Sequence, residues 1–124
     1  MSSQQEKRKY PRLSISDREY GIRLRVNGSL VQDPRLVNLS AGGCGLEIQM
    51  AEARHLEVGD LLESVFLDHS DLPFLPLSAT VVRLLGKVAG KTGGYVLLGL
   101  EFQEITPFVR ELIADHVAER LRQE

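Results

Sequence analysis

The sequence lacks the features that mark several classes of protein. Its 124 residues include one cysteine, Cys44, and no tryptophan, and aromatic residues make up 6% of the chain. A lone cysteine excludes an intramolecular disulfide framework and cannot by itself form a thiolate zinc site. A single thiol also fits a reducing compartment, so we expect a cytoplasmic protein.

Long apolar runs are absent as well. The longest runs, such as residues 95–98, fall far short of the roughly 20 residues that a membrane-spanning helix needs. Residues 2–6 are polar and do not resemble a secretory signal. We therefore expect no membrane insertion.

Neither sign of charge dominates the chain. Lys and Arg number 15 against 17 Asp and Glu, which gives a formal net charge of -2. A protein that coats DNA or another polyanion is normally basic throughout, so we expect no DNA binding. An anionic ligand of this chain must instead be small and bound by a local cluster of cations.

Signatures of catalysis and of metal binding are missing too. No nucleophile-elbow pattern surrounds any serine. Residues 86–92 resemble a phosphate-binding loop, but the spacing is one residue short and a strand pattern follows instead of a helix. His116 falls on the apolar side of a predicted helix, where we expect packing, and His69 falls in a stretch that we interpret as a solvated turn. We predict neither an enzyme nor a metal site.

The sequence does contain a repeated alternation of apolar residues with polar residues or glycine, which is typical of strands. Strands are predicted over residues 20–26, 30–39, 44–50, 61–67, 75–85 and 96–102. Asn27-Gly28 predicts a tight hairpin turn, because both central positions of that turn need positive φ. Pro34 predicts an edge position or an irregularity. Cys44 alternates inward and is interpreted as a small buried apolar side chain.

The period changes to that of a helix after residue 105. Thr106 is a suitable N-cap, and Pro107 fits the first helical position, where a missing N–H is harmless. Apolar residues then recur at helical spacing and predict an amphipathic helix over residues 107–122. The whole pattern indicates an all-β dominated fold, an antiparallel barrel or sandwich, with one C-terminal α-helix.

Positive charge is concentrated at the start of the chain. Residues 1–12 contain the cations Lys7, Arg8, Lys9 and Arg12. We expect this stretch to form a flexible, exposed basic arm that orders on a ligand, while residues 13–124 form a single domain. Pro11 disfavours a helix, so Arg8 and Arg12 lie on extended chain and can reach separate parts of one ligand. Each guanidinium offers a planar fork that matches phosphate oxygens or the O6/N7 edge of guanine.

A second motif lies at the junction of two predicted strands. Asn38 carries a hydrogen-bond donor and an acceptor, and Ser40 adds a hydroxyl. Gly42 and Gly43 permit positive φ and let a planar group approach the main chain. Taken alone, these residue types are also what a tight turn uses.

Together the two motifs resemble those of the PilZ domain family. The resemblance covers nearly the whole chain and rests on Arg8-x-x-x-Arg12 followed by Asn38-x-Ser40-x-x-Gly43. It implies a six-stranded antiparallel β-barrel with a C-terminal helix, which serves as a non-catalytic receptor for cyclic di-GMP. Arg8 and Arg12 would hold phosphates and guanines, Asn38 and Ser40 would engage a guanine and its backbone, and Gly43 would leave space for the base.

The resemblance also implies how such a protein acts. Cyclic di-GMP would be the ligand, and its binding would rearrange the arm and signal to an effector protein in motility, biofilm or exopolysaccharide control. We expect a monomer or a weak dimer. The alternative is a barrel of the same fold that serves as a protein-interaction module without binding the nucleotide. A binder of single-stranded nucleic acid is disfavoured, because such proteins use several exposed aromatic residues on a basic face.

Overall fold

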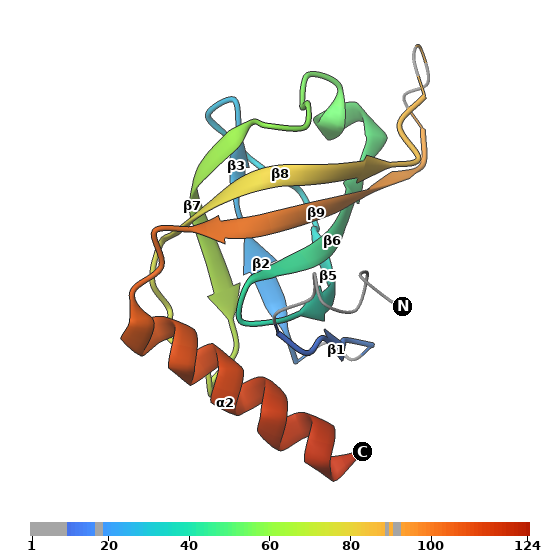
Figure 1. Cartoon of the computed structure of the whole chain (residues 1–124). Helices are drawn as coiled ribbons and strands as arrows, with labels where there is room; N and C mark the ends of the chain where they lie inside the picture. The colour runs from blue at the N-terminus through green and yellow to red at the C-terminus, as the bar shows by residue number, and fades with distance from the viewer. Residues whose placement is uncertain (1–9, 17–18, 89, 91–92) are drawn as a thin grey trace, which may run out of the picture.

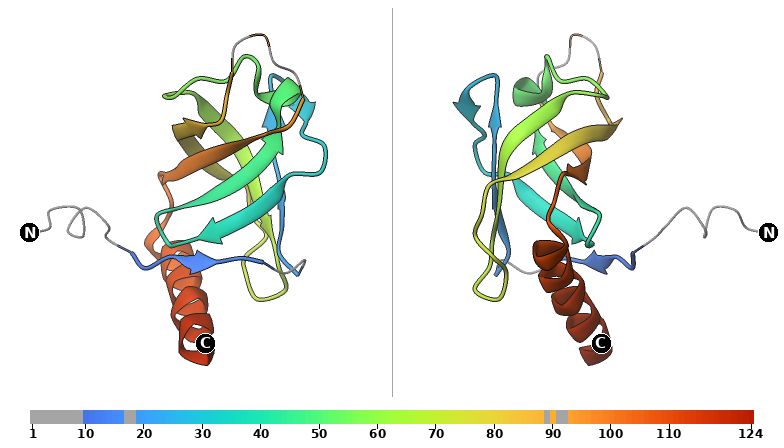
Figure 2. Two further views of the ribbon diagram at one scale, coloured as in Figure 1. Left: turned by 90° about the vertical axis from the view of Figure 1, so that its right-hand side faces the viewer. Right: turned by 60° about the vertical axis from the view of Figure 1, so that its left-hand side comes forward.

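The computed structural model describes residues 10–16, 19–88, 90 and 93–124. An antiparallel sheet curls around one apolar core, and a single long helix lies against one end of it (Figures 1 and 2). The strands are β1 (Leu13–Ser14), β2 (Gly21–Arg23), β3 (Arg25–Val26), β4 (Ser29–Leu30), β5 (Arg35–Leu39), β6 (Gly43–Gln49), β7 (Leu61–Asp68), β8 (Leu77–Leu85) and β9 (Tyr95–Gln103). The helices are the short 3₁₀ helix η1 (Met50–Ala53) and the α-helix α2 (Pro107–Gln123).

Seven of these strands form the main sheet, in the order β1-β5-β6-β9-β8-β7-β2. The strands β3 and β4 form a separate two-stranded ribbon. The predicted antiparallel β architecture with one C-terminal helix is confirmed. The sheet is not closed into a barrel by hydrogen bonds among the described residues, because no ladder joins the end strands β1 and β2. The strand β2 does approach β5.

The first predicted strands differ most from the structure. Residues 20–26 do not form one strand: β2 ends before Leu24 and pairs with β7, whereas β3 pairs with β4. The predicted turn is confirmed, because Asn27 and Gly28 have φ values of 53° and 81°. The return strand over residues 30–39 is also divided, and Asp33, with φ of 52°, lies between β4 and β5. Each break lets neighbouring residues pair with a different strand.

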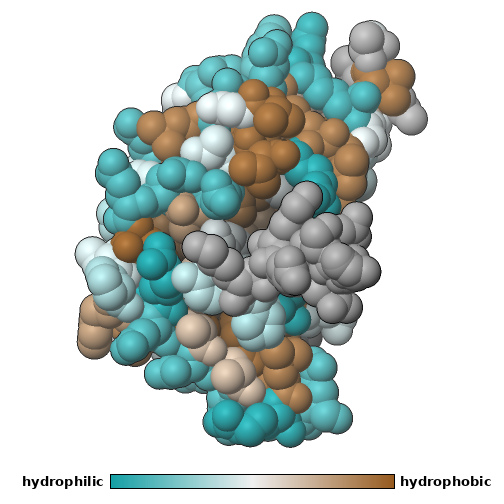
Figure 3. All heavy atoms as spheres, viewed as in Figure 1, coloured by the Kyte–Doolittle hydropathy of each residue, from teal (hydrophilic) through white to brown (hydrophobic). Residues whose placement is uncertain are grey.

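The later strands follow the prediction within a few residues. Alternate side chains of β6, β8 and β9 are buried, and together with α2 they form the core. The stretch that resembles a phosphate-binding loop is followed by β9 and not by a helix, as the strand pattern predicts. In the view of Figure 1 apolar surface gathers over β8 and β9, where Val82 and Leu85 are exposed (Figure 3).

The helix α2 begins as predicted. The Thr106 side chain accepts a hydrogen bond of 3.3 Å from the Val109 N–H, and Pro107 occupies the first turn. Ile113 and Val117 are buried against the sheet, so the helix packs through one stripe of its surface. No helix among the described residues is long and apolar enough to cross a membrane.

Two irregularities in the sheet set up the site. The β5–β6 pairing shifts register between Leu36 and Asn38, and the β8–β9 pairing shifts between Val81 and Arg83. A bulge of this kind changes which face of the sheet a following side chain points to. Both bulges lie beside the same pocket, which Asn38 and Arg83 line.

Candidate ligand-binding site

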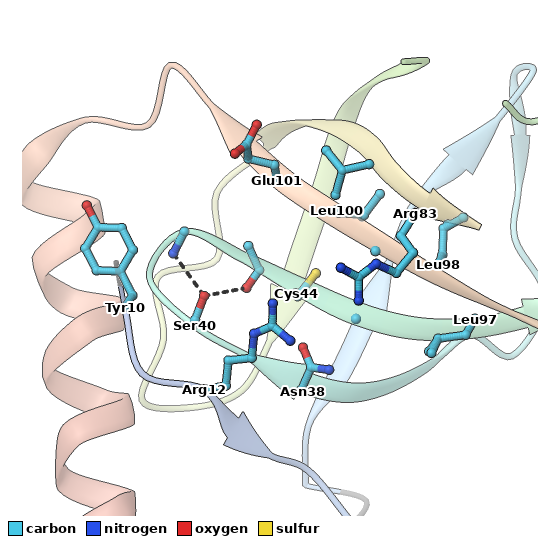
Figure 4. Close-up of a pocket in the computed structure, with 15 residues that line it drawn as sticks. Tyr10, Arg12, Asn38, Ser40, Cys44, Arg83, Leu97, Leu98, Leu100 and Glu101 are labelled. Atoms are coloured by element: carbon cyan, nitrogen blue, oxygen red, sulfur yellow. Dashed lines mark hydrogen bonds between the residues drawn. The ribbon is translucent and has the colours of Figure 1, made fainter. Parts of the chain in front are cut away.

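A cavity of about 370 Å³ lies on the outer face of the sheet (Figure 4). Its walls come from the segment before β1, from β5 and β6, and from β8 and β9. These strands are neighbours in the sheet, so the cavity crosses its central part. We call this cavity the pocket.

The pocket brings together four of the five residues that the sequence singles out. Arg12, Asn38, Ser40 and Gly43 all line it, although they come from two segments far apart in the chain. Arg8 lies outside the described residues. The same holds for most of the predicted basic arm, so a mobile arm over residues 1–12 stays a prediction.

The turn before β6 uses the hydroxyl of Ser40. This oxygen accepts a hydrogen bond of 3.1 Å from the Gly42 N–H and lies 3.4 Å from the Gly43 carbonyl, to which it donates. The Ser40 N–H also donates to the Gly43 carbonyl at 2.9 Å. Ser40 therefore stabilises the turn itself, and one lone pair of its oxygen is left for a ligand.

A glycine is required at position 43 for a structural reason that the sequence does not reveal. A Cβ atom at this position would lie 2.0 Å from the Leu100 carbonyl oxygen of β9, far inside contact distance. Neither Gly42 nor Gly43 has positive φ. The lack of a side chain at Gly43 thus allows β6 and β9 to pair closely, which explains the glycine without any ligand.

The position of the Asn38 side chain depends on another glycine, which leaves room for it. It pairs with Gly45 across the β5–β6 ladder, and a Cβ on Gly45 would lie 2.7 Å from Asn38 Nδ2. The Asn38 amide therefore lies flat over the backbone of β6. The amide faces the pocket from that position (Figure 4).

Sequence reasoning missed several residues of the pocket. Tyr10 is half-buried over Gly42, where its ring lies 3.0 Å from the position of a Cβ. This contact differs from the expectation that Tyr10 is part of an exposed arm, because the absent side chain of Gly42 makes room for the ring. Arg83 and Glu101 come from β8 and β9. Nothing local marks Arg83, since its place depends on the bulge in β8 and on the register with Gly99.

Cys44 lies beneath the pocket and is inert. The side chain is 5% exposed, as predicted, and burial raises the pKa of its thiol to about 12. A thiol with such a pKa is protonated at neutral pH and is a poor nucleophile.

A second group of polar side chains lies between α2 and the sheet, away from the pocket. We call Tyr20, His69, His116 and Arg120 the Tyr20 cluster. The Tyr20 hydroxyl and His116 Nε2 share a hydrogen bond of 2.6 Å, and the Tyr20 ring stacks on His69 with centroids 4.2 Å apart. The predicted packing of His116 at the core edge is confirmed, since it is 8% exposed.

His69 differs from its prediction as a residue of a solvated turn. It is only 9% exposed, because the ring is covered by Tyr20. Its Nδ1 accepts the Asp71 N–H at 3.0 Å, and its Nε2 lies 3.3 Å from the Arg120 guanidinium. Ligand atoms of His69, Asp71 and His116 lie within 4.8 Å of one another, but the adjacent guanidinium opposes a bound cation. The Tyr20 cluster is therefore best explained as packing.

The comparisons with known proteins agree with this fold. A scan against protein families matches residues 6–119 to the PilZ domain. No curated protein sequence matches the chain. Among solved structures, the PilZ domain of YcgR from Escherichia coli with c-di-GMP is similar, with a TM-score of 0.69 and 20% identity over 94% of this chain and 95% of that chain.

Two longer proteins contain a similar domain. The complex of K. pneumonia MrkH with c-di-GMP has a TM-score of 0.70 and 18% identity over 94% of this chain and 55% of that chain. The inhibitor of motility MotI/DgrA from Bacillus subtilis has a TM-score of 0.70 and 16% identity over 94% of this chain and 52% of that chain. This chain thus spans about half the length of these two proteins. The family match covers most of the chain, and we conclude that it belongs to the PilZ domain family of non-catalytic cyclic di-GMP receptors.

Proposed function

We propose that this protein binds cyclic di-GMP in the pocket and passes the signal to an effector protein in the cytoplasm. The observation that carries the proposal is the convergence of Arg12, Asn38, Ser40 and Gly43 on one cavity. These residues come from the two motifs that resemble the PilZ family. The complexes of YcgR and of MrkH with c-di-GMP support the choice of ligand.

The chemistry of the pocket suits a flat, doubly charged ligand. Arg12 supplies a guanidinium, which can donate two parallel hydrogen bonds to a phosphate. Asn38 offers a donor and an acceptor to the edge of a guanine. Gly42, Gly43 and Gly45 line the same cavity, so a planar base meets little side-chain bulk there.

Arg8 completes the proposed site from the arm. With Arg12 it would hold phosphates and guanines, and closure of the arm would trade chain entropy for charge-assisted hydrogen bonds. Binding would then change the surface beside the pocket, which is a means of switching an effector.

Calorimetry with cyclic di-GMP tests the proposal. We expect a dissociation constant on the order of micromolar or lower for the unaltered protein. Arg12→Ala should weaken binding by about ten- to a hundredfold, because each lost charge-assisted hydrogen bond is worth about 1.5–3 kcal/mol. Arg54→Ala is the matched control, since Arg54 is exposed at the end of η1 and does not line the pocket.

The alternative is a PilZ-fold interaction module that does not bind the nucleotide. Absence of any heat or thermal shift with cyclic di-GMP, in protein that still captures its effector, would favour that alternative. Equal affinities of the Arg12→Ala and Arg54→Ala variants would contradict the proposed site.

A further inference from the structure

The bulge in β8 turns Arg83 toward the pocket. Alternation along β8 buries Leu77, Ala79 and Val81, so a regular strand would also bury residue 83. The register shift between Val81 and Arg83 interrupts this alternation, and Val82 and Arg83 are both exposed. Bulges occur often beside functional sites, where they redirect a side chain.

The strand opposite Arg83 makes room for it. Arg83 pairs with Gly99 of β9, and a Cβ on Gly99 would lie 3.0 Å from the Arg83 Cβ. The side chain of Arg83 thus crosses β9 without an obstacle. Figure 4 shows its guanidinium directed into the pocket, facing Asn38 and Arg12.

Asn38 and Arg83 are placed by the same device. Each follows a bulge, and each lies over a glycine of the neighbouring strand, Gly45 for Asn38 and Gly99 for Arg83. The two glycines belong to β6 and β9, the central strands of the pocket. The pocket therefore has one bulge-directed polar side chain on each side of a floor that contains glycine.

Arg83 differs from the arginines that form ion pairs on the surface. Arg23 forms an ion pair with Asp68, and Arg120 contacts Glu19. For Arg83 the described part of the chain contains no hydrogen bond or ion pair. Glu101, the acidic residue of the pocket, accepts from Gln103 at 3.3 Å. Arg83 is thus a cation directed into a cavity with its donors available.

Arg83 and Arg12 lie at opposite sides of the pocket. The sheet order places β8 four strands away from β1, which Arg12 immediately precedes. Counted along the curled sheet, four strand spacings of about 4.8 Å separate the two backbones, and the curl brings them closer together than that path. Two long side chains that point into the cavity from different strands can bind different parts of a small ligand.

We propose that Arg83 is a further ligand-binding residue, which donates to a phosphate of the ligand on the side opposite Arg12. This inference rests on the proposed function, because it assigns a residue to the same site. The guanidinium would form a bidentate contact with two phosphate oxygens. A lysine at this position would keep the charge but lose the fork.

The test is calorimetry with cyclic di-GMP on the full chain and on the variants Arg12→Ala, Arg83→Ala, Arg83→Lys and Arg54→Ala. We expect Arg83→Ala to raise the dissociation constant about ten- to a hundredfold, and Arg83→Lys to raise it less. Arg54→Ala removes the same charge from an exposed position outside the pocket and should change the constant less than about threefold, as expected for screened surface charge. Thermal unfolding without ligand checks that each variant is folded, and Arg83→Gln replaces Arg83→Ala if the latter is not.

The outcomes separate this inference from the proposed function. If Arg12→Ala loses affinity while Arg83→Ala matches Arg54→Ala, the role of Arg83 is wrong and the receptor function stands. If the unaltered protein does not bind cyclic di-GMP, both proposals fail. A loss with Arg83→Ala that Arg83→Lys partly restores supports a phosphate contact.

Discussion

The pocket and the Tyr20 cluster use similar polar side chains in opposite ways. In the Tyr20 cluster, Arg120 contacts His69 and Glu19, and His116 shares a hydrogen bond with Tyr20. In the pocket, Arg83 has no partner among the residues that the structure describes. The residues of the Tyr20 cluster form hydrogen bonds with one another, whereas Arg83 directs its donors into a cavity.

Pairing within a group of polar side chains distinguishes a structural group from a binding site in this small domain. Buried polar groups that are paired with one another add to the stability of the fold. Polar groups directed over glycines into an open cavity add little stability and are available to a ligand. Substitutions in the Tyr20 cluster should therefore lower the free energy of unfolding. Substitutions on the floor of the pocket should lower the affinity for cyclic di-GMP, with one exception.

That exception is Gly43, for which we expect the largest effect. Gly43→Ala would bring a Cβ to 2.0 Å from the Leu100 carbonyl oxygen, and both atoms belong to rigid paired strands. Overpacking of this kind costs about 3 kcal/mol or prevents folding. Chemical denaturation of the variant measures the loss. An unfolding free energy equal to that of the unaltered protein would contradict a structural role for this glycine.

The next largest effect is expected in the Tyr20 cluster. Tyr20→Phe removes the hydroxyl that lies 2.6 Å from His116 Nε2 and leaves a buried nitrogen without its partner. Such a loss costs about 1–3 kcal/mol of unfolding free energy. Affinity for cyclic di-GMP should stay unchanged in the folded variant. Tyr95→Phe is the control, because Tyr95 is exposed. A loss of affinity without a loss of unfolding free energy would contradict a structural role for the Tyr20 cluster.

Gly45→Ala should lower the affinity for cyclic di-GMP and leave the stability nearly unchanged. The added Cβ would meet Asn38 Nδ2 at 2.7 Å, but this amide is the end of a flexible side chain and can rotate away. We expect little change in stability and a loss of affinity of about fivefold, the worth of a hydrogen bond of about 1 kcal/mol.

A double-mutant cycle sharpens this prediction. If Gly45→Ala acts by displacing Asn38, it should have no further effect on affinity in an Asn38→Ala background. Additive losses would mean that the glycine contributes to binding independently of the amide.

The smallest expected effect is a dependence of stability on pH through His116. Burial lowers the pKa of His116 below its ordinary value of 6.5, the neighbouring His69 and the guanidinium of Arg120 lower it further, and Asp71 opposes them. The unfolded chain therefore takes up this proton at a higher pH than the folded protein does. The contribution of His116 to stability is present above pH 6.5 and is lost as the pH falls below it, toward the folded-state pKa.

Denaturation at a series of pH values measures this loss. His116→Gln should remove part of the decrease below pH 6.5, whereas His55→Gln should not, because His55 is exposed. The same pH dependence in both variants would show that the pKa of His116 does not differ between the folded and the unfolded protein.

Several elements could be predicted from short stretches of sequence. Thr106 and Pro107 start α2 through contacts within one helical turn, and Asn27-Gly28 forms its turn through the φ values of two residues. Alternation along β6 predicts the burial of Cys44. In each case the controlling interaction joins residues that are neighbours in the chain, so the sequence pattern carries the information.

The division of residues 20–26 into β2 and β3 could not be predicted in this way. The apolar alternation continues through Leu24, yet β2 pairs with β7, which lies more than 35 residues further along the chain. The choice of partner depends on how well both strands bury their apolar faces in the assembled core. The free energy gained by that choice of partner cannot be predicted from a local sequence pattern.

The antiparallel β architecture, the C-terminal helix and the two motifs that resemble the PilZ family could all be predicted from the sequence. The folded chain was needed to see that Arg83 and Tyr10 line one pocket with Arg12 and Asn38, and that the absence of a side chain at Gly43 allows β6 and β9 to pair. Local periods and caps arise from interactions within a few residues, whereas these placements depend on bulges and register between distant strands. Register is set when the two faces of the sheet are packed, which requires the whole chain.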